Sequence, residues 1–340
     1  MSTPPATAII LAGAVAKGAF QAGVLEVVAA RAPRIARIVA TSAGALNGAV
    51  LAVGVRFGRL AVAAEVITRT WLEHATWQQL LRPSLAALRR GGLSSSAGVG
   101  EAVEAAMTQV VPAVRDPDVP LADVHLQMVT AALQGKPSAR GPRAAAGDTT
   151  FEHVVEFAGA SLDTAAGRAA VVHAASASAA FPGLFAPVEL PPVGPCLDGG
   201  AVDNTPVSYA LESLDVGRVV VVTDNPQRRA HDPALRGWAV IGRTIDIVIN
   251  ERLFRDLAFA HRVNAKLAEL DALTRGWGLS DDQRAALADT LGWRPIELIQ
   301  VRPERSLEGS PFAALADRRL RAEYIAEGRR AAERAFAALP

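Results

Sequence analysis

Ser42 is the residue whose surroundings point most directly to chemistry. An apolar, β-prone run precedes it (Ile38-Val39-Ala40-Thr41), and the segment that follows, Ala43-Gly44-Ala45-Leu46, favours a helix. A sharp turn between a strand and a helix exposes the serine hydroxyl at the carboxyl edge of a sheet. It also directs the next backbone N–H groups along a helix N-terminus. Ser42 is therefore a candidate nucleophile, with Gly44 as a supporting residue of the turn.

A carboxylate that would serve as the base for this serine is Asp198. Gly199 and Gly200 follow it directly, and they let the backbone turn tightly while another segment approaches the carboxylate. Asn204 and Pro206 then favour a turn. We therefore expect Asp198 to lie at a tight turn, with both glycines supporting it.

A small-residue loop, Gly13-Ala14-Val15-Ala16-Lys17-Gly18, lies between the first predicted strand and its helix. Backbone N–H groups of Gly13 and Ala14, together with that of Ala43, would point at developing negative charge and form an oxyanion hole. Lys17 and Gly18 end the loop and are the candidates for anchoring it.

Histidine offers an alternative base at two positions. His173 precedes Asp198 in the chain, an order that fits no known Ser-His-Asp triad, and it lies in a helical pattern rich in Ala and Val. An unrelated α/β-hydrolase or thioesterase would need a late histidine near the site, and His261 is the late candidate we consider. It also lies in a helical pattern, so we favour a site without imidazole.

Composition excludes several classes of protein. The chain has 340 residues, is 50% hydrophobic, and carries a formal net charge of +1, which argues against general nucleic-acid binding. One cysteine, Cys196, excludes an internal disulfide, and the histidines lack the spacing of metal ligands, so we expect no metal. The apolar segment 6–16 has no positive side chain before it, so we interpret it as a buried strand and do not expect export. We expect a cytoplasmic protein without a transmembrane segment.

The order of elements indicates the fold class. Strand, helix, strand, helix from residue 7 onward predicts parallel strands joined by right-handed crossovers. We expect a three-layer α/β/α fold with a mainly parallel sheet, a helical cap at 76–122 and a C-terminal, mostly helical part at 225–340 packed on the same domain. Trp71 and Trp77 are interpreted as packing residues. The predicted strands are 7–12, 34–41, 124–133, 150–157, 218–223 and 296–301, and the predicted helices are 18–30, 43–55, 59–75, 164–179, 237–270, 281–291 and 313–338.

In combination, these motifs resemble the patatin-like phospholipase family. That family is marked by a glycine-rich loop ending in a basic residue and glycine, a G-x-S-x-G elbow, and a later D-G-G or D-G-A. Here the loop runs from Gly13 to Lys17-Gly18, the elbow is Ala40-Thr41-Ser42-Ala43-Gly44, and the third motif is Asp198-Gly199-Gly200. The stretches 177–185 and 204–207 resemble the segments on either side of the aspartate, so the resemblance covers about residues 7–224 in matching order.

The resemblance implies a serine acyl hydrolase that acts on lipid or other acyl esters through a Ser–Asp dyad. Ser42 would be the nucleophile and Asp198 the base, and water would release the fatty acid from an acyl-enzyme. No cofactor would be needed. The acyl ester would be met in solution or at a membrane surface by a peripherally bound protein, and the oligomeric state is left open.

One departure from the family pattern leaves an alternative open. Ala12, Ala14 and Val15 stand where the family has glycines. A residue with a Cβ atom costs about 1–2 kcal/mol wherever the backbone needs a positive φ, and β-branched Val15 is the worst suited. The alternative is a patatin-fold binding or assembly protein that is impaired in catalysis.

Overall fold

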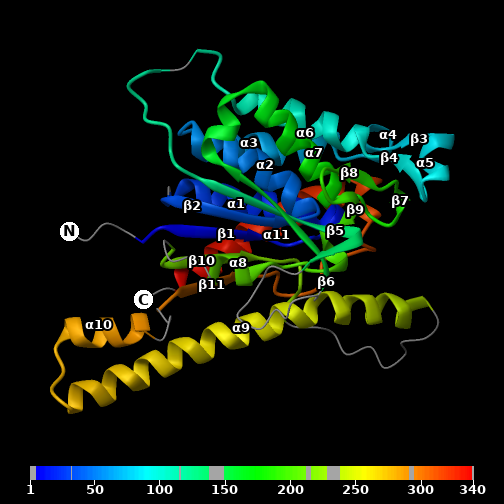
Figure 1. Ribbon diagram of the computed structural model, residues 1–340. Helices are drawn as coiled ribbons and strands as arrows, with labels where there is room; N and C mark the ends of the chain where they lie inside the picture. The colour runs from blue at the N-terminus through cyan, green and yellow to red at the C-terminus, as the bar shows by residue number, and fades with distance from the viewer. Residues whose placement is uncertain are drawn as a thin grey trace.

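The chain folds around a central β-sheet with helices on both faces (Figure 1). A computed structural model describes residues 5–31, 33–114, 116–137, 149–211, 216–227, 238–290 and 295–338. The fold is mixed α/β with a mainly parallel sheet, as the order of elements in the sequence predicts.

Eight strands of the described chain form the main sheet, in the order β11-β10-β1-β2-β5-β9-β8, with β6 paired to β5. The strands from β11 to β5 are parallel, whereas β6, β9 and β8 run antiparallel to the neighbours they pair with. Their bounds are β1 Thr7–Leu11, β2 Ile35–Thr41, β5 His125–Pro137, β6 Thr149–Ala158, β8 Val188–Leu190, β9 Gly194–Asp198, β10 Arg218–Val222 and β11 Glu297–Val301.

Strand β5 receives two partners in succession along one edge. Its first positions pair with β2 and end at Val129 opposite Thr41, and the next position, Thr130, faces Asp198 of β9. Because β6 pairs with the same stretch of β5 along the other edge, β9 continues the line of β2. This register places Asp198 directly beyond the end of β2, where Ser42 follows.

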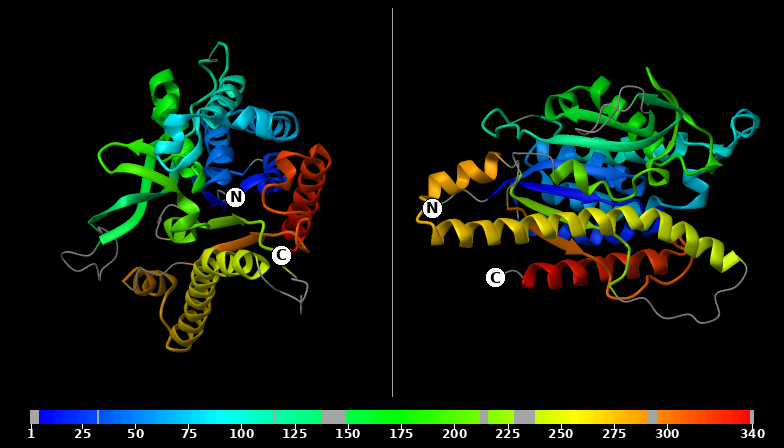
Figure 2. Two further views of the ribbon diagram at one scale, coloured as in Figure 1. Left: turned by 90° about the vertical axis from the view of Figure 1, so that its right-hand side faces the viewer. Right: turned by 60° about the horizontal axis from the view of Figure 1, so that its bottom comes forward.

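Alternate residues of β1 enter two different hydrophobic cores, because successive side chains of a strand point to opposite faces. Ile9 and Leu11 pack into the core on one face, and Ala8 and Ile10 into the core on the other. Figure 2 shows helices lying on both sides of the sheet. The first face is covered by α1 (Gly18–Ala30), α2 (Ala43–Arg56), α3 (Leu60–Arg69), α6 (Ala97–Val110), α7 (Ala165–Ser178) and α11 (Arg318–Ala337), and the second by α8 (Val207–Leu211) and α9 (Trp238–Gly276).

The predicted cap, residues 76–122, contains strands as well as helices. Besides α6 it has α4 (Trp77–Leu80), β3 (Arg82–Pro83), α5 (Leu85–Arg89) and β4 (Gly92–Ser95), and a π-helical turn, η2 (Thr70–His74), leads into it. A second sheet, β3-β4-β7, joins the cap to β7 (Gly183–Phe185). The prediction of short helices alone was wrong here, because such short strands are too brief to show an alternating pattern and their prolines and glycines resemble turns.

Strands β8 and β9 were also missed, and Asp198 ends a strand where only a turn was expected. The pair Gly194-Pro195 is typical of a turn or loop and therefore does not indicate a strand. The structure accommodates Pro195 because pairing with β5 begins only at Cys196, so the missing proline N–H removes no hydrogen bond to β5.

Within the described ranges, the C-terminal part supplies an edge strand and two covering helices, α9 and α11. Strand β11 pairs with β10, and α11 lies along α1. A Cβ atom at Gly23 would lie 1.9 Å from the carbonyl oxygen of Ile325, and one at Gly328 would lie 2.0 Å from that of Phe20. Glycine at both positions therefore lets the two helices touch backbone to backbone. The domain boundary at 224/225 stays a prediction. Helix α10 (Asp281–Thr290) and the short turn η5 (Ala313–Leu315) complete this part.

Within the described ranges, no helix combines the length and the apolar character needed to cross a bilayer.

Candidate active site

Ser42 occupies the turn between β2 and α2 in a strained conformation, with φ 54° and ψ −125°. A non-glycine residue rarely adopts a positive φ, so the surrounding contacts must hold it there. Its N–H donates to Oγ of Ser178 at 2.9 Å, and that hydroxyl donates to the carbonyl oxygen of Val129 at 2.6 Å. Gly44 lets α2 approach β1, since a Cβ atom there would lie 2.2 Å from the carbonyl oxygen of Leu11.

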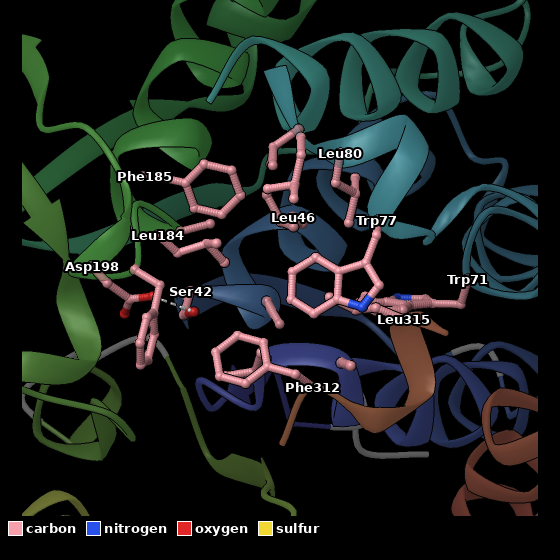
Figure 3. A pocket seen from close by; sticks show the side chains of 17 residues that line it. Ser42, Leu46, Trp71, Trp77, Leu80, Leu184, Phe185, Asp198, Phe312 and Leu315 are labelled. Atoms are coloured by element: carbon pink, nitrogen blue, oxygen red, sulfur yellow. Dashed lines mark hydrogen bonds between the residues drawn. The ribbon is translucent and has the colours of Figure 1, made fainter. Parts of the chain in front are cut away.

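The Ser42 hydroxyl meets the Asp198 carboxylate. Ser42 Oγ donates to Asp198 Oδ2 at 2.6 Å, and the N–H of Gly200 donates to Asp198 Oδ1 at 2.7 Å (Figure 3). Both side chains are almost fully enclosed, with 6% of Ser42 and 4% of Asp198 exposed. A contact this short between a hydroxyl and a carboxylate is typical of a charge-assisted hydrogen bond.

Burial changes the acidity of Asp198. It raises the pKa of the carboxyl from its ordinary 3.8 to about 6, although the hydrogen bonds from Ser42 and Gly200 pull the pKa in the opposite direction. Charge is costly in a low-dielectric environment, so the buried carboxylate gains affinity for a proton. A carboxylate with a pKa near neutrality is a stronger base than an exposed one and still ionises at physiological pH.

The glycine pair after Asp198 serves two different contacts. A Cβ atom at Gly199 would lie 2.1 Å from the carbonyl oxygen of Val129, so glycine allows the turn to sit against β5. Gly200 supplies the N–H that holds Asp198. The sequence predicted a supporting role for both residues from the D-G-G pattern.

The predicted oxyanion loop is held by reciprocal bonds to Asn204. The N–H of Gly13 donates to the backbone oxygen of Asn204 at 2.9 Å, and Nδ2 of Asn204 donates to the Gly13 carbonyl at 3.0 Å. The Gly13 amide is therefore engaged with Asn204, which corrects the prediction that it is a donor of the oxyanion hole.

The rest of the loop forms a short 3-10 turn, η1 (Val15–Lys17). Val15 has φ 48°, a value that is strained for a β-branched residue. The sequence predicts this strain because the family has glycine at the position of Val15. The N–H of half-buried Lys17 closes the turn on the Ala14 carbonyl at 2.9 Å. Gly18 makes room for Trp71, whose ring carbon would lie 2.5 Å from a Cβ atom there.

A small cavity of about 70 Å³ opens beside the Ser42–Asp198 pair (Figure 3). Apart from those two residues, its walls are apolar. They are Val15, Ala16, Ala43, Leu46, Trp71, Trp77, Leu80, Leu81, Val99, Ala179, Phe181, Leu184, Phe185, Phe312 and Leu315. The hydroxyl and carboxylate thus face a lining suited to hydrocarbon.

Several of these wall residues were not anticipated as site residues. Trp71 and Trp77 pack in or against the core, as the sequence predicts, and both also line the cavity. Phe312 stacks on Trp77 with ring centroids 5.7 Å apart and meets Phe181 edge-on at 5.3 Å. Only the fold brings Phe312 here, because no local pattern links residue 312 to an elbow at residue 42.

A buried polar chain behind the elbow was also missed. Gln21 Nε2 donates to the carbonyl oxygen of Ala12 at 2.6 Å, and Asn47 Nδ2 donates to Gln21 Oε1 at 2.9 Å. Trp71 Nε1 completes the chain by donating to Asn47 Oδ1 at 2.8 Å. These bonds tie the start of the loop to α1, α2 and the cavity wall. The sequence does contain a signal for this chain of hydrogen bonds, because Gln21 and Asn47 are polar residues within predicted helices that are otherwise apolar.

The two candidate histidines lie elsewhere. His173 is exposed on α7, and its Nε2 is 2.7 Å from the carbonyl oxygen of Glu189. His261 is exposed on α9, which covers the other face of the sheet from α2. The contact to Ser42 Oγ comes from Asp198, not from an imidazole.

The fold and the site together define a class: an α/β protein with a strained serine at a strand–helix elbow, hydrogen-bonded to a carboxylate and open to an apolar cavity. The chain belongs to the patatin-like phospholipase family, whose model matches residues 9–211, more than half of the chain.

Two solved structures resemble this one at low sequence identity. VipD from Legionella pneumophila shares 14% identity with a TM-score of 0.41, over 99% of this chain and 67% of that protein. The type III effector protein ExoU shares 13% identity with a TM-score of 0.39, over 98% of this chain and 53% of that protein. The chain thus spans about two thirds of the length of the first and about half that of the second. No curated protein matches it.

Proposed function

We propose that this chain is a serine acyl hydrolase that cleaves lipid or other acyl esters through a Ser42–Asp198 dyad. The observation that carries the proposal is the 2.6 Å contact between Ser42 Oγ and Asp198 Oδ2 at the edge of an apolar cavity. Membership of the patatin-like phospholipase family supports the choice of lipid esters.

In the first half of the reaction, Ser42 Oγ attacks the ester carbonyl while its proton passes to Asp198 Oδ2. Asp198 then gives this proton to the departing alcohol, which leaves an acyl group on Ser42. In the second half, Asp198 takes a proton from water, which attacks the carbonyl of the acyl-enzyme. Asp198 then returns this proton to Ser42 Oγ as the bond between Oγ and the acyl group breaks, and the fatty acid is freed. The dyad ends as it began, so no cofactor is consumed.

The negative charge that develops on the carbonyl oxygen needs N–H donors nearby. Ala43 is the first residue of α2 and lines the cavity next to Ser42, so its N–H combines with the positive end of the helix dipole. The turn at Ala14 and Val15 is the second source, because Val15 lines the same cavity. We therefore assign the oxyanion hole to Ala43 and this turn.

A binding or assembly role without hydrolysis is the second candidate. Two observations favour it: the Gly13 amide is bonded to Asn204, and Val15 adopts a positive φ where the family pattern has glycine. A loop altered in this way would offer fewer donors to an oxyanion, and the loss of one donor costs about 3–4 kcal/mol in the transition state.

The two candidates are separated by labelling with a fluorophosphonate probe and by turnover of short-chain and long-chain nitrophenyl esters. The variants are Ser42→Ala and Asp198→Asn, with Ser176→Ala as a matched serine control and His173→Ala as an imidazole control. Ser176 is as buried as Ser42, but its hydroxyl donates to the carbonyl oxygen of Val172 within α7.

Labelling and turnover should be lost with the first two variants and kept with both controls. A parent chain that neither labels nor turns over any ester would favour the binding role. Loss of activity in His173→Ala would restore a triad and contradict the dyad.

A further inference from the structure

An exposed apolar tip projects from the cap next to the cavity. It consists of Leu85 and Leu88 on α5 and Leu93 on β4, whose exposed fractions are 75%, 58% and 60%. Leu85 and Leu88 are one helical turn apart and share a face of α5, whereas Ala87 is buried. We call these three side chains the leucine tip. Figure 1 shows α5 and β4 extending beyond the main body of the protein.

The leucine tip continues the apolar wall of the cavity. Strand β4 pairs in parallel with β7 through Gly92 opposite Gly183 and Ser94 opposite Phe185. Leu93 is therefore level with Leu184, and side chains at the same level of neighbouring strands point to the same face. Leu184 lines the cavity that holds Ser42. Leu93 of the leucine tip thus lies on the same face of this small sheet as a residue of the cavity wall.

The chain segment that carries the tip is basic. Residues 75–100 contain Arg82, Arg89 and Arg90 and no aspartate or glutamate. Arg82 pairs with Glu101 and Arg90 with Glu189, both at exposed positions where solvent and competing anions weaken such pairs. Exposed leucines flanked by arginines match a bilayer surface with anionic headgroups, where leucine enters the acyl boundary and arginine stays with the phosphates.

We propose that the leucine tip docks the protein on an anionic lipid surface and brings the mouth of the cavity against it. The occupant is a lipid bilayer rather than another protein, because the tip combines protruding leucines, a segment whose charged residues are all arginines, and a position beside a cavity suited to acyl chains. Docking of this kind does not depend on hydrolysis.

The test is co-sedimentation of the full chain with vesicles of phosphatidylcholine, alone or mixed with phosphatidylserine. All proteins carry Ser42→Ala, so that hydrolysis cannot alter the vesicles. Leu88→Gln probes the tip. The matched control is Leu273→Gln, because Leu273 is also a helical leucine, is 57% exposed and lies in the last turn of α9. Figure 1 shows that this end of α9, which leads to α10, is far from α5. Urea unfolding checks that both variants are folded.

We expect binding to the mixed vesicles, weaker binding to phosphatidylcholine alone, and further weakening with added salt. Leu88→Gln should lower the partition coefficient about tenfold, as loss of one buried leucine predicts, while Leu273→Gln leaves it unchanged. The proposal is overturned by absence of vesicle binding, by equal binding to both vesicle types, or by equal effects of the two variants. Vesicle binding by a chain whose parent never labels with fluorophosphonate would keep the docking site and reject the hydrolase.

Discussion

The buried charge of Asp198 should make the protein less stable at neutral pH than its packing alone would allow. Above its folded-state pKa the carboxyl is ionised in a site that disfavours charge, whereas in the unfolded chain it ionises near 3.8 at little cost. The folded protein therefore binds more protons than the unfolded chain between these values, and its free energy of unfolding falls as pH rises. The gap between 3.8 and about 6, at ~1.4 kcal/mol per pKa unit, amounts to about 3 kcal/mol once pH exceeds about 7.

Asp198→Asn removes this titration while keeping the size of the side chain. We expect the free energy of unfolding of the variant, relative to the parent, to rise by about 2 kcal/mol between about pH 4 and about pH 7. The difference in free energy of unfolding between the two proteins at the lower pH reflects altered hydrogen bonds to Ser42 and Gly200. Only the change in this difference with pH tests the buried charge. Urea unfolding at a series of pH values measures the difference directly.

Glu26→Gln is the control, because its effect should have the opposite sign. Burial raises the pKa of Glu26, but hydrogen bonds from Arg329 and Thr68 outweigh burial and bring that pKa below its ordinary value. Its stabilising contribution is present above the unfolded pKa and is lost as pH falls, so the glutamine variant should fall behind the parent as pH rises. A pH-independent difference between parent and Asp198→Asn would refute the reasoning about the buried carboxylate.

Three further outcomes follow from the site. For the proposed hydrolase, kcat/KM should rise with pH through about 6 and level off above it, because Asp198 must be ionised to accept the serine proton; a profile without an acid limb would argue against this base. Gly44→Ala should destabilise the protein by about 2–4 kcal/mol in urea unfolding, because the added methyl meets the Leu11 carbonyl, whereas Gly276→Ala, which meets open space, should be near neutral. Ser178→Ala leaves the Ser42 N–H and the Val129 carbonyl without their partner, so it should cost about 1–3 kcal/mol of stability and lower ester turnover while fluorophosphonate labelling slows rather than disappears.

The elbow was predictable from sequence because its signals are local. An apolar strand run, a serine among small residues and a helix-favouring segment occupy consecutive positions, and the structure has β2, Ser42 and α2 at that place. The D-G-G pattern likewise identified Asp198 and its two glycines. Each of these signals reflects the backbone conformation of a few consecutive residues, and a single sequence carries that information.

The remaining parts of the site depend on contacts between distant segments. Asp198 lies beside Ser42 because β9 continues the line of β2 along β5. Strand β9 was not predictable, because its Gly194 and Pro195 are typical of a turn rather than a strand. The place of Gly13 in the loop predicts a donor of the oxyanion hole, but its N–H donates to the backbone oxygen of Asn204, which lies 191 residues later in the chain. A pattern of residue types does not reveal which partner an amide will find.

The position of Phe312 has a consequence for how the proposed hydrolase would select its substrate. Ser42 and Asp198, the proposed nucleophile and base, lie within residues 9–211, whereas Phe312 and Leu315, which line the same cavity, come from a segment that the family model does not reach. In the proposed hydrolase, the reaction rate and the choice of acyl group would therefore depend on separate stretches of chain. Substitutions at Phe312 or Leu315 would enlarge or shorten the space for a fatty acid without changing Ser42 or Asp198.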